Sequence, residues 1–430
     1  MEAPRREPNA TAGTGRWQAA FGFIFATVLL DMLAIGIVIP VLPKLVVDFM
    51  AGDAEQATKI FGLFGTAFAL MQFLFSPLQG ALSDRFGRRT MILISNFGVG
   101  LDYIVMAVAP TLGWLFVGRV FSGITAASIS TSYAYVADVT PPDRRAARFG
   151  LLGAAFGAGF VLGPALGGLA GSISPRLPFW IAAGLSLANA CYGLLVLPES
   201  LPRSRRAAFN WRRANPLGAL ALLRSHIELS RLAVVNFLSD LAHAVLPRIA
   251  VLYMLFRYGF DERAVGLTMA GVGVASIVVQ GAVVGVVTRW LGDRVSLLLG
   301  LGFGVLGFLV LTFASSGVVF WLGIPLLALW GLESPAVLAL MSRRVDGAEQ
   351  GRLQGANASI TGMANLFGPG LFTQAFAYAI GAGAGAGWHL PGFPFLIATL
   401  LLALAALLAW RVTGAYAVPI AAVPLGGREP

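Results

Sequence analysis

The sequence predicts an all-α polytopic membrane protein with twelve transmembrane helices in two six-helix pseudo-repeats. Three observations predict it: the composition, the spacing of the apolar segments, and an internal offset that relates the two halves. Hydrophobic residues make up 57% of the 430 residues and charged residues only 12%, whereas a soluble globular chain carries roughly 25% charged residues. So little charge cannot cover a surface that faces water, and most of the exterior is therefore expected to face lipid.

Six apolar segments of the first half are each long enough to cross a bilayer, which takes about 20 mostly apolar residues in a helix. Short polar connections separate them, so successive helices are expected to run antiparallel and to pack together. We predict an N-terminal six-helix bundle over residues 17–197, preceded by a cytoplasmic tail over residues 1–16. The six segments are 17–42, 60–82, 90–109, 112–137, 149–171 and 177–197.

A polar linker over residues 198–231, rich in arginine, divides the chain into two sets of six helices. Six further apolar segments follow it, and they predict a C-terminal six-helix bundle over residues 232–411 with a cytoplasmic tail over 412–430. The segments are 232–256, 264–287, 295–314, 318–341, 353–379 and 392–410.

The distribution of positive charge predicts the orientation in the membrane. If the N-terminus is cytoplasmic, 22 of the 30 lysines and arginines fall in segments on the cytoplasmic side and 5 in outer loops. Cytoplasmic loops of membrane proteins carry an excess of these residues. Both termini and the linker are therefore predicted to be cytoplasmic. The same rule explains the net charge of +10 without a nucleic-acid partner, because the charges are scattered and form no dense patch.

An offset of 205 residues relates the first half to the second. It maps Gly87 to Gly292 and Arg89 to Arg294, after the second helix of each half. Each half has an even number of helices, so both start on the same side and form parallel repeats about an axis along the membrane normal. The other matched positions are Gly80 and Gly285, Gly150 and Gly355, Gly157 and Gly362, and Gly163-Pro164 and Gly368-Pro369.

Ionisable residues inside the predicted helices mark the candidate site, because a charge at the bilayer centre costs roughly 2.5–3.5 kcal/mol on insertion scales. Such residues usually face a bundle interior or a wet cavity. Asp102, on the third helix, is expected to be a structural polar residue. The others fall on the first, fourth, seventh and tenth helices, which are equivalent in pairs under the offset: Asp31, Arg119, Asp240, His243, Arg248 and Glu333.

Two interpretations are open for these residues. Asp31 and Arg119 are predicted either to couple transport to protons and recognise substrate charge, or to form a purely structural buried pair. Asp240 and His243 lie three residues apart on one helical face and predict either a proton relay or a structural contact. The candidate substrate contacts are Asp31, Gln72, Asp240, Glu333 and Asn365.

Several other functions are excluded by missing motifs. The single cysteine, Cys191, allows no internal disulfide. No G-x-x-x-x-G-K-[ST] segment is present, so the chain carries no ATPase of that type. The three histidines, His226, His243 and His389, lie too far apart for a metal motif, and no metal site or cofactor is expected. The first sixteen residues are polar, and no cleaved targeting peptide is expected.

The segment from Gly80 to Arg89, Gly-Ala-Leu-Ser-Asp-Arg-Phe-Gly-Arg-Arg, resembles the cytoplasmic loop motif of the major facilitator superfamily. Gly87 permits a tight turn, and the acid and the arginines can pair with helix ends and lipid phosphates. The resemblance implies that Asp84 stabilises one of two alternating states. The residues expected to gate the conformational change are Gly80, Asp84, Arg85, Gly87, Arg88, Arg89, Gly163 and Pro164.

Two further motifs support this resemblance. Arg119, in Val-Gly-Arg-Val-Phe-Ser-Gly, resembles the fourth-helix motif, whose arginine is linked in the family to proton movement. The glycines from Gly153 to Gly168 resemble the fifth-helix motif of drug/proton antiporters. Small residues permit close helix contact in membranes, and Pro164 interrupts the helical hydrogen bonds.

Longer stretches are similar to the tetracycline/proton antiporters over nearly the whole chain. They include Leu30-Asp31-Met-Leu-Ala-Ile-Gly36, Leu101-Asp102-Tyr103 and Ser342-Arg-Arg-Val-Asp346. This resemblance implies export of a metal–tetracycline chelate in exchange for a proton. The matching residues are Asp31, Gln72, Asp84, Asp102 and Arg119.

The chain also departs from those exporters. They commonly have an acid in the ninth helix, where residues 295–314 have none. Their seventh helix is amide-rich, whereas this chain has Asp240 and His243, and Glu333 is an additional acid. Membership of the superfamily is therefore a firmer expectation than tetracycline as the substrate.

These observations together predict a proton-coupled antiporter that exports small amphiphilic drugs by alternating access. It is expected to act as a monomer in a bacterial-type inner membrane, with a divalent metal present only as part of a chelated substrate. Two alternatives stay open: a proton-coupled importer of a small metabolite on the same fold, and a non-transporting membrane receptor or scaffold. A membrane enzyme is a more distant alternative, because no nucleophile–base pair or metal cluster is found.

Overall fold

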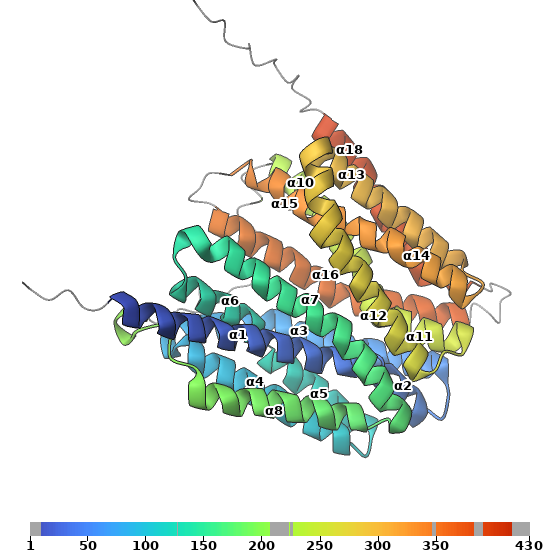
Figure 1. The fold of residues 1–430 in the computed structure, drawn as a ribbon. Coiled ribbons are helices and arrows are strands. Elements are labelled where there is room, and N and C mark those ends of the chain that lie inside the picture. The colour runs from blue at the N-terminus through green and yellow to red at the C-terminus, as the bar shows by residue number, and fades with distance from the viewer. Residues whose placement is uncertain are drawn as a thin grey trace, which may run out of the picture.

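The computed structural model describes residues 10–126, 128–206, 223, 227–345, 350–381 and 390–414, and every regular element in these ranges is helical (Figure 1). Most of the predicted tails and of the predicted linker lies outside the described residues, while residues 10–16 and 412–414 belong to helices. The first half contains α1 (Ala10–Val38), α2 (Leu42–Phe49), α3 (Ala54–Phe86), α4 (Arg88–Val108), α5 (Leu112–Thr125), α6 (Ser128–Val139), α7 (Pro142–Ile173), α8 (Leu177–Val196) and the short η1 (Arg203–Arg205).

The second half contains α10 (Ile227–His243), α11 (Leu246–Tyr258), α12 (Glu262–Val278), the π-helical η3 (Val279–Val283), α13 (Val284–Phe313), α14 (Gly317–Leu329), the 3₁₀-helical η4 (Trp330–Leu332), α15 (Glu333–Ser342), α16 (Gln350–Ile380) and α18 (Phe393–Gly414). Most predicted helices lie within one of these helices or a run of successive ones, and α13 includes parts of two predicted helices, 264–287 and 295–314.

Ten stretches of the described residues are long and apolar enough to cross a membrane. One of them, Glu262–Phe313, contains two predicted helices, 264–287 and 295–314, and includes a break at Gly292. The predicted helix 353–379 lies in α16, which is not among the ten. The all-helical membrane fold is confirmed, while the number twelve stays a prediction.

The predicted loop after the second helix is largely helical, which corrects one expectation. Gly80, Asp84 and Arg85 lie in the last turns of α3, which ends only at Phe86. Gly87 stops the helix because its φ of 107° suits glycine and strains other residues. The equivalent Gly292 has a φ of 75° within α13, so the two glycines predicted to be equivalent both interrupt a helix.

The predicted fourth helix is divided where α5 ends at Thr125. The last carbonyls of a helix have no partner within it, and lipid offers none. Side chains of neighbouring helices supply the hydrogen bonds here: Gln79 donates from its amide to the carbonyl of Ile124, and Ser95 donates to the carbonyl of Thr125. The break is therefore accommodated by polar residues on α3 and α4.

Prolines divide the predicted seventh and tenth helices. Pro247 stands in the first turn of α11, just after the break that follows His243. Pro335 is the third residue of α15, after the 3₁₀ turn η4. Proline is tolerated in the first turn of a helix but not in its interior, so each helix restarts at the proline. The breaks leave His243 and Glu333 at helix ends.

Equivalent helices pack together in the two halves. Within the halves, α1 packs on α7 as α10 packs on α16, and α4 packs on α8 as α13 packs on α18. Between the halves, α3 packs on α16 and α7 packs on α12. These two inter-half pairs exchange under the offset of 205 residues. The packing therefore supports the predicted pseudo-two-fold arrangement.

The halves meet closely at the end predicted to face outward. In Figure 1, α2 and α11 lie together at the right, whereas α1 begins at the left and α18 ends at the top. Helix α2 contacts α11, and Lys44 on α2 forms an ion pair with Glu262 at the start of α12. The carboxylate is buried and Lys44 is about a third exposed. This ion pair joins the two halves.

Candidate functional site

A buried ion pair lies between α4 and α5. Nη2 of Arg119 is 3.0 Å from Oδ2 of Asp102, and the side chain of Asp102 is fully buried. The hydroxyl of Ser122 donates to the same Oδ2 atom, and Arg119 lies over the ring of Phe68 at 5.8 Å. Gly118 leaves the space for the carboxylate, because a Cβ atom there would lie 2.6 Å from Oδ1 of Asp102.

Asp31 occupies a separate hydrogen-bonded position on α1. Its Oδ1 accepts a hydrogen bond of 3.1 Å from Nδ2 of Asn189 on α8, and Oδ1 of Asn189 accepts one from Thr27. Arg119 pairs with Asp102, which was expected to be a structural polar residue, while the coupling role of Asp31 and Arg119 stays a prediction.

Asp102 and Arg119 can pair because they lie at the same depth in the bundle. Asp102 lies six residues before the end of α4, and Arg119 lies seven residues after the start of α5. Two successive antiparallel helices place such residues at the same depth. Equal distance from the intervening turn was a usable sequence signal. The symmetry between the first, fourth, seventh and tenth helices does not include the third helix, which carries Asp102.

The polar residues of the second half gather around α10. Oδ2 of Asp240 accepts a hydrogen bond of 2.7 Å from the hydroxyl of Thr361 on α16, and Nδ2 of Asn236 lies 3.5 Å away. The ring of His243 lies 5.4 Å from that of Trp330 in η4. His243 is exposed, and the proton relay between His243 and Asp240 stays a prediction.

Glu333 begins α15 close to this cluster. Its side chain is 5% exposed, and Oε1 is buried without a hydrogen-bond partner. The backbone packs against α13, where a Cβ atom on Gly300 would lie 2.6 Å from the nitrogen of Glu333. Gln72 on α3 and Asn365 on α16 are half-buried on the two helices that pack across the halves. The predicted substrate contacts thus divide between both halves.

The predicted gating residues form a charged network at the junction of α3 and α4. Arg88 forms ion pairs with Asp84 at 2.6 Å and with Asp138 on α6 at 3.2 Å. Its backbone N–H, in the first turn of α4, donates to Oε1 of Glu199, a favourable place for an anion. Arg89 donates to the carbonyl of Leu194 at the end of α8.

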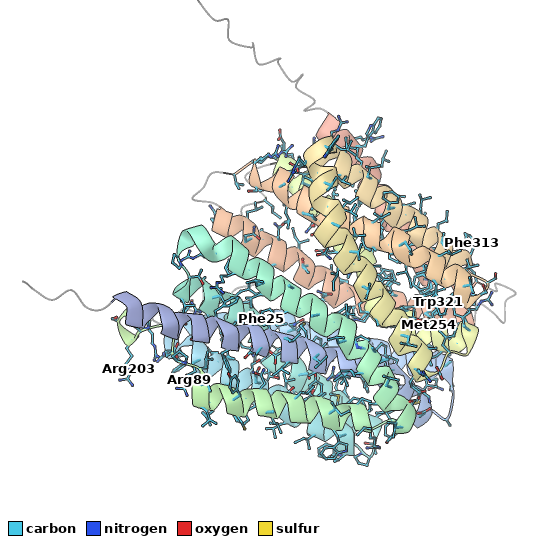
Figure 2. All side chains as sticks on the ribbon, viewed as in Figure 1. Phe25, Arg89, Arg203, Met254, Phe313 and Trp321 are labelled. Atoms are coloured by element: carbon cyan, nitrogen blue, oxygen red, sulfur yellow. The ribbon has the colours of Figure 1, made fainter. Side chains whose placement is uncertain are left out.

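This network connects helices within the N-terminal half. Arg85 lies over the neighbouring Phe86 ring at 5.2 Å, and Gly87 leaves no room for a Cβ atom beside the carboxylate of Glu199. In Figure 2, Arg89 and Arg203 lie at the opposite end of the half from α2. The charged network and the inter-half ion pair of Lys44 therefore stand at opposite ends of the bundle.

The glycines of α7 pack against both halves. A Cβ atom on Gly163 would lie 2.6 Å from the Cα atom of Gly36 on α1, so the two backbones are in direct contact. On another face of α7, Gly168 and the carbonyl of Pro164 approach Gly266 on α12. Gly163 and Pro164 thus lie where α7 joins the first half to the second.

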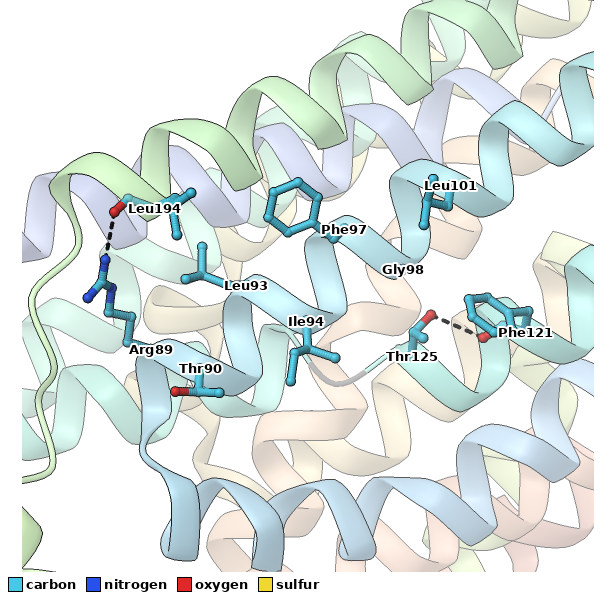
Figure 3. A pocket seen from close by; sticks show the side chains of 10 residues that line it. All are labelled: Arg89, Thr90, Leu93, Ile94, Phe97, Gly98, Leu101, Phe121, Thr125 and Leu194. Carbon is cyan, nitrogen blue, oxygen red and sulfur yellow. Dashed lines mark hydrogen bonds between the residues drawn. The ribbon is translucent and has the colours of Figure 1, made fainter.

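A shallow hollow of about 520 Å³ lies on the surface of α4, between α5 and α8 (Figure 3). Its walls are apolar, and Ile94, Leu101 and Phe121 are exposed. Of the predicted site residues only Arg89 lines it. Because a chain with this composition exposes apolar side chains to lipid, the hollow belongs to the lipid-facing surface.

Within the described residues, no group of three or more histidine, cysteine or acidic side chains has the arrangement of a metal site. His243 is described, while His226 and His389 lie outside the described residues.

Comparison with known proteins identifies the family. The profile of the Major Facilitator Superfamily matches residues 24–369. The tetracycline resistance protein, class C, of Escherichia coli is 36% identical over 87% of this chain and 94% of its own length. The class B protein of Escherichia coli is 34% identical over 90% of this chain and 95% of its own length.

The solved structures add a likeness in fold. The human organic anion transporter MFSD10 (TETRAN) superimposes with a TM-score of 0.68 and 25% identity, and the match covers 94% of this chain and all of the human one. The similarity in sequence and in structure extends across both predicted halves.

Proposed function

Because this multi-pass membrane chain belongs to the major facilitator superfamily, we propose that it is a proton-coupled antiporter that exports small amphiphilic drugs, tetracycline-like ones foremost. The observation that carries the proposal is the buried acids of the N-terminal half, Asp31 and the Asp102–Arg119 pair. Ionisable groups at such positions in membrane helices commonly belong to proton or substrate pathways. The similarity to the tetracycline resistance proteins supports the substrate class.

The proton is exchanged by the carboxylates of Asp31 and Asp102. A proton on Asp102 removes the charge that holds Arg119, and a proton on Asp31 changes the acceptor that Asn189 faces. Hydration and the distance to a charged partner both determine whether a carboxyl group is ionised. Rocking of the halves changes both, so each opening to water favours uptake or release of a proton.

The proposed orientation in the membrane follows from the distribution of lysine and arginine between the loops. The protein works as a monomer in a bacterial-type inner membrane with both termini in the cytoplasm, and it uses no cofactor. A divalent metal enters only as part of a chelated substrate. The energy comes from the proton gradient, since the sequence carries no P-loop.

Two measurements test the proposal. The first determines the direction in which the drug is transported. In inside-out vesicles an exporter accumulates tetracycline when the lumen is acid, and the accumulation collapses when the proton gradient is dissipated. An importer on the same fold shows no such accumulation. A receptor or scaffold moves no drug under either condition.

The second measurement is a drug-resistance panel in an efflux-deficient bacterium. We expect wild type to protect, and Asp31→Asn and Asp102→Asn each to abolish protection at equal amounts of protein in the membrane. Asp53→Asn is the matched control: Asp53 is exposed and caps α3 by accepting from the N–H of Gln56, and asparagine caps equally well. If neither wild type nor the Asp53→Asn control protects the bacterium against any drug, export of antibiotics is refuted.

A further inference from the structure

The buried acids of the two halves differ in their partners. Asp102 pairs with Arg119, Glu262 pairs with Lys44, and Asp293 pairs with Arg343 at 2.5 Å. Asp240 and Glu333 form no ion pair within the part of the chain that the structure describes. A buried charge is costly unless it is paired and hydrogen-bonded. Within the described residues, the half-buried Asp240 and the buried Glu333 thus differ from Asp102, Glu262 and Asp293, each of which faces a lysine or an arginine.

The two acids belong to one cluster, which we call the acid site: Asp240, His243, Trp330, Glu333 and Thr361. Two positions before Glu333, a Cβ atom on Gly331 would lie 4.0 Å from Cγ of Gln280 in the π-helical η3, and η3 packs against η4, so two irregular turns meet beside the acid. Trp330 donates from its indole N–H to Ser239, which precedes Asp240 on α10. Irregular backbone at membrane depth is tolerated only inside protein or beside a water-filled cavity.

The acid site is open on one side. His243 and Thr361 are exposed, and α10 and α16 pack together where the second half faces the first. Thr361 donates to Asp240, while Oε1 of Glu333 is buried and has no partner. A group that enters beside Thr361 meets the hydrogen-bonded carboxylate of Asp240, behind which the buried Glu333 of the same cluster has an unsatisfied oxygen.

We propose that the acid site binds the cationic group of the transported molecule, which is an amphiphile with a protonated amine or an onium centre. This inference rests on the proposed export function and specifies its substrate class. The carboxylates of Asp240 and Glu333 supply the charge that the protein leaves unpaired. The exposed ring of His243, which lies 5.4 Å from that of the buried Trp330, supplies an aromatic surface for the apolar part of the molecule.

Binding to the purified full-length protein in detergent tests the site with two ions of the same shape. Tetraphenylphosphonium is a cation and tetraphenylborate an anion, and equilibrium dialysis gives the dissociation constant of each. We expect saturable binding of the cation by wild type and a Kd raised about ten-fold or more in Glu333→Gln and Asp240→Asn, since each variant removes a negative charge that attracts the cation in a site of low dielectric constant. The borate is expected to bind more weakly than the cation.

Two further variants separate charge from structure. Glu333→Asp keeps the carboxylate and is expected to recover most of the affinity for the cation, while Asp53→Asn leaves it unchanged. If the Kd for tetraphenylphosphonium is unaffected in both neutral variants, or if both ions bind equally well, the inference is wrong. It is also wrong if Glu333→Gln stops export of the uncharged drug chloramphenicol while cation binding is intact, because Glu333 is then a proton site.

Transport in vesicles distinguishes this inference from the proposed function. A wild-type protein that binds tetraphenylphosphonium but moves neither it nor tetracycline refutes export and leaves the cation site standing. If the wild-type protein exports tetracycline, but neither Asp240→Asn nor Glu333→Gln changes the affinity for tetraphenylphosphonium, only the cation site is refuted.

Discussion

Arg119 and Asp102 illustrate what a single residue contributes inside this bundle. Their pair is almost completely removed from water, with side-chain exposures of 15% and 0%. Removing one member of such a pair leaves the other charge buried and uncompensated, which costs about 3–5 kcal/mol. Removing both members is often nearly neutral. The intact pair therefore adds little net stability, although each member depends on the other.

This argument predicts the outcome of a double-mutant cycle. We expect Arg119→Leu to lower the thermal stability of the detergent-purified protein strongly, and Asp102→Asn combined with Arg119→Leu to restore most of it. The exposed pair of Lys59 and Glu55 is the control, because surface ion pairs contribute only about 0–1 kcal/mol. Equal destabilisation by the single and the double variant contradicts the buried pairing.

At the same scale, the sequence alone was enough to find the ionisable residues but not their partners. Hydropathy singles out Asp31, Asp102 and Arg119, because charges are rare in apolar segments. Which acid meets the arginine depends on helix rotation and depth. Asn189, which binds Asp31, is an ordinary amide in an apolar helix and gives no comparable signal.

Among the elements, α7 has the most demanding packing. Its glycines allow its backbone to touch α1 at Gly36 and α12 at Gly266. The hydrophobic effect does not drive association between helices in lipid. The close van der Waals packing that small residues permit at such crossings holds the helices together instead. The sequence predicted this contact-forming role. It did not indicate that different faces of the same helix serve α1 and the opposite half.

Two glycines of the same motif should therefore respond differently to alanine. At Gly163 a Cβ atom would meet the backbone of Gly36 at 2.6 Å, whereas at Gly153 it would meet nothing within 4 Å. We expect Gly163→Ala to destabilise the protein by about 1–3 kcal/mol through overpacking and to abolish drug resistance. Gly153→Ala should be neutral or slightly stabilising, because alanine is the better helix former.

Thermal unfolding in detergent and the resistance panel measure both effects. Gly36→Ala, which places the methyl group on the other side of the same contact, should resemble Gly163→Ala. Full activity of both variants would show that α1 and α7 separate easily, and the close contact would then have no functional consequence.

For the whole molecule, the offset of 205 residues predicted related halves, and the equivalent helix pairs and glycine breaks agree with it. It could not predict which end of the halves is closed. The same sequence pattern serves every state of an alternating-access cycle, and such states differ by only a few kcal/mol. The closed end is instead defined by particular contacts, foremost the ion pair of Lys44 with Glu262.

This ion pair predicts a state-dependent accessibility. On a Cys191→Ser background, Val265→Cys replaces a fully buried residue of α12, one turn after Glu262. We expect a membrane-impermeant maleimide added outside intact cells to label it slowly. Lys44→Glu should raise the labelling rate several-fold, because two like charges then face each other across the halves and favour opening.

The exchange of both charges makes this test specific. Lys44→Glu combined with Glu262→Lys restores an attractive pair and should return the labelling rate toward the original value. If neither Lys44→Glu nor the double variant alters the labelling rate, the pair does not hold the halves together. Labelling from the cytoplasmic side alone would invert the predicted orientation, because the closed end would then face inward. The charge swap thus tests the coupling of the halves and their placement in the membrane in one experiment.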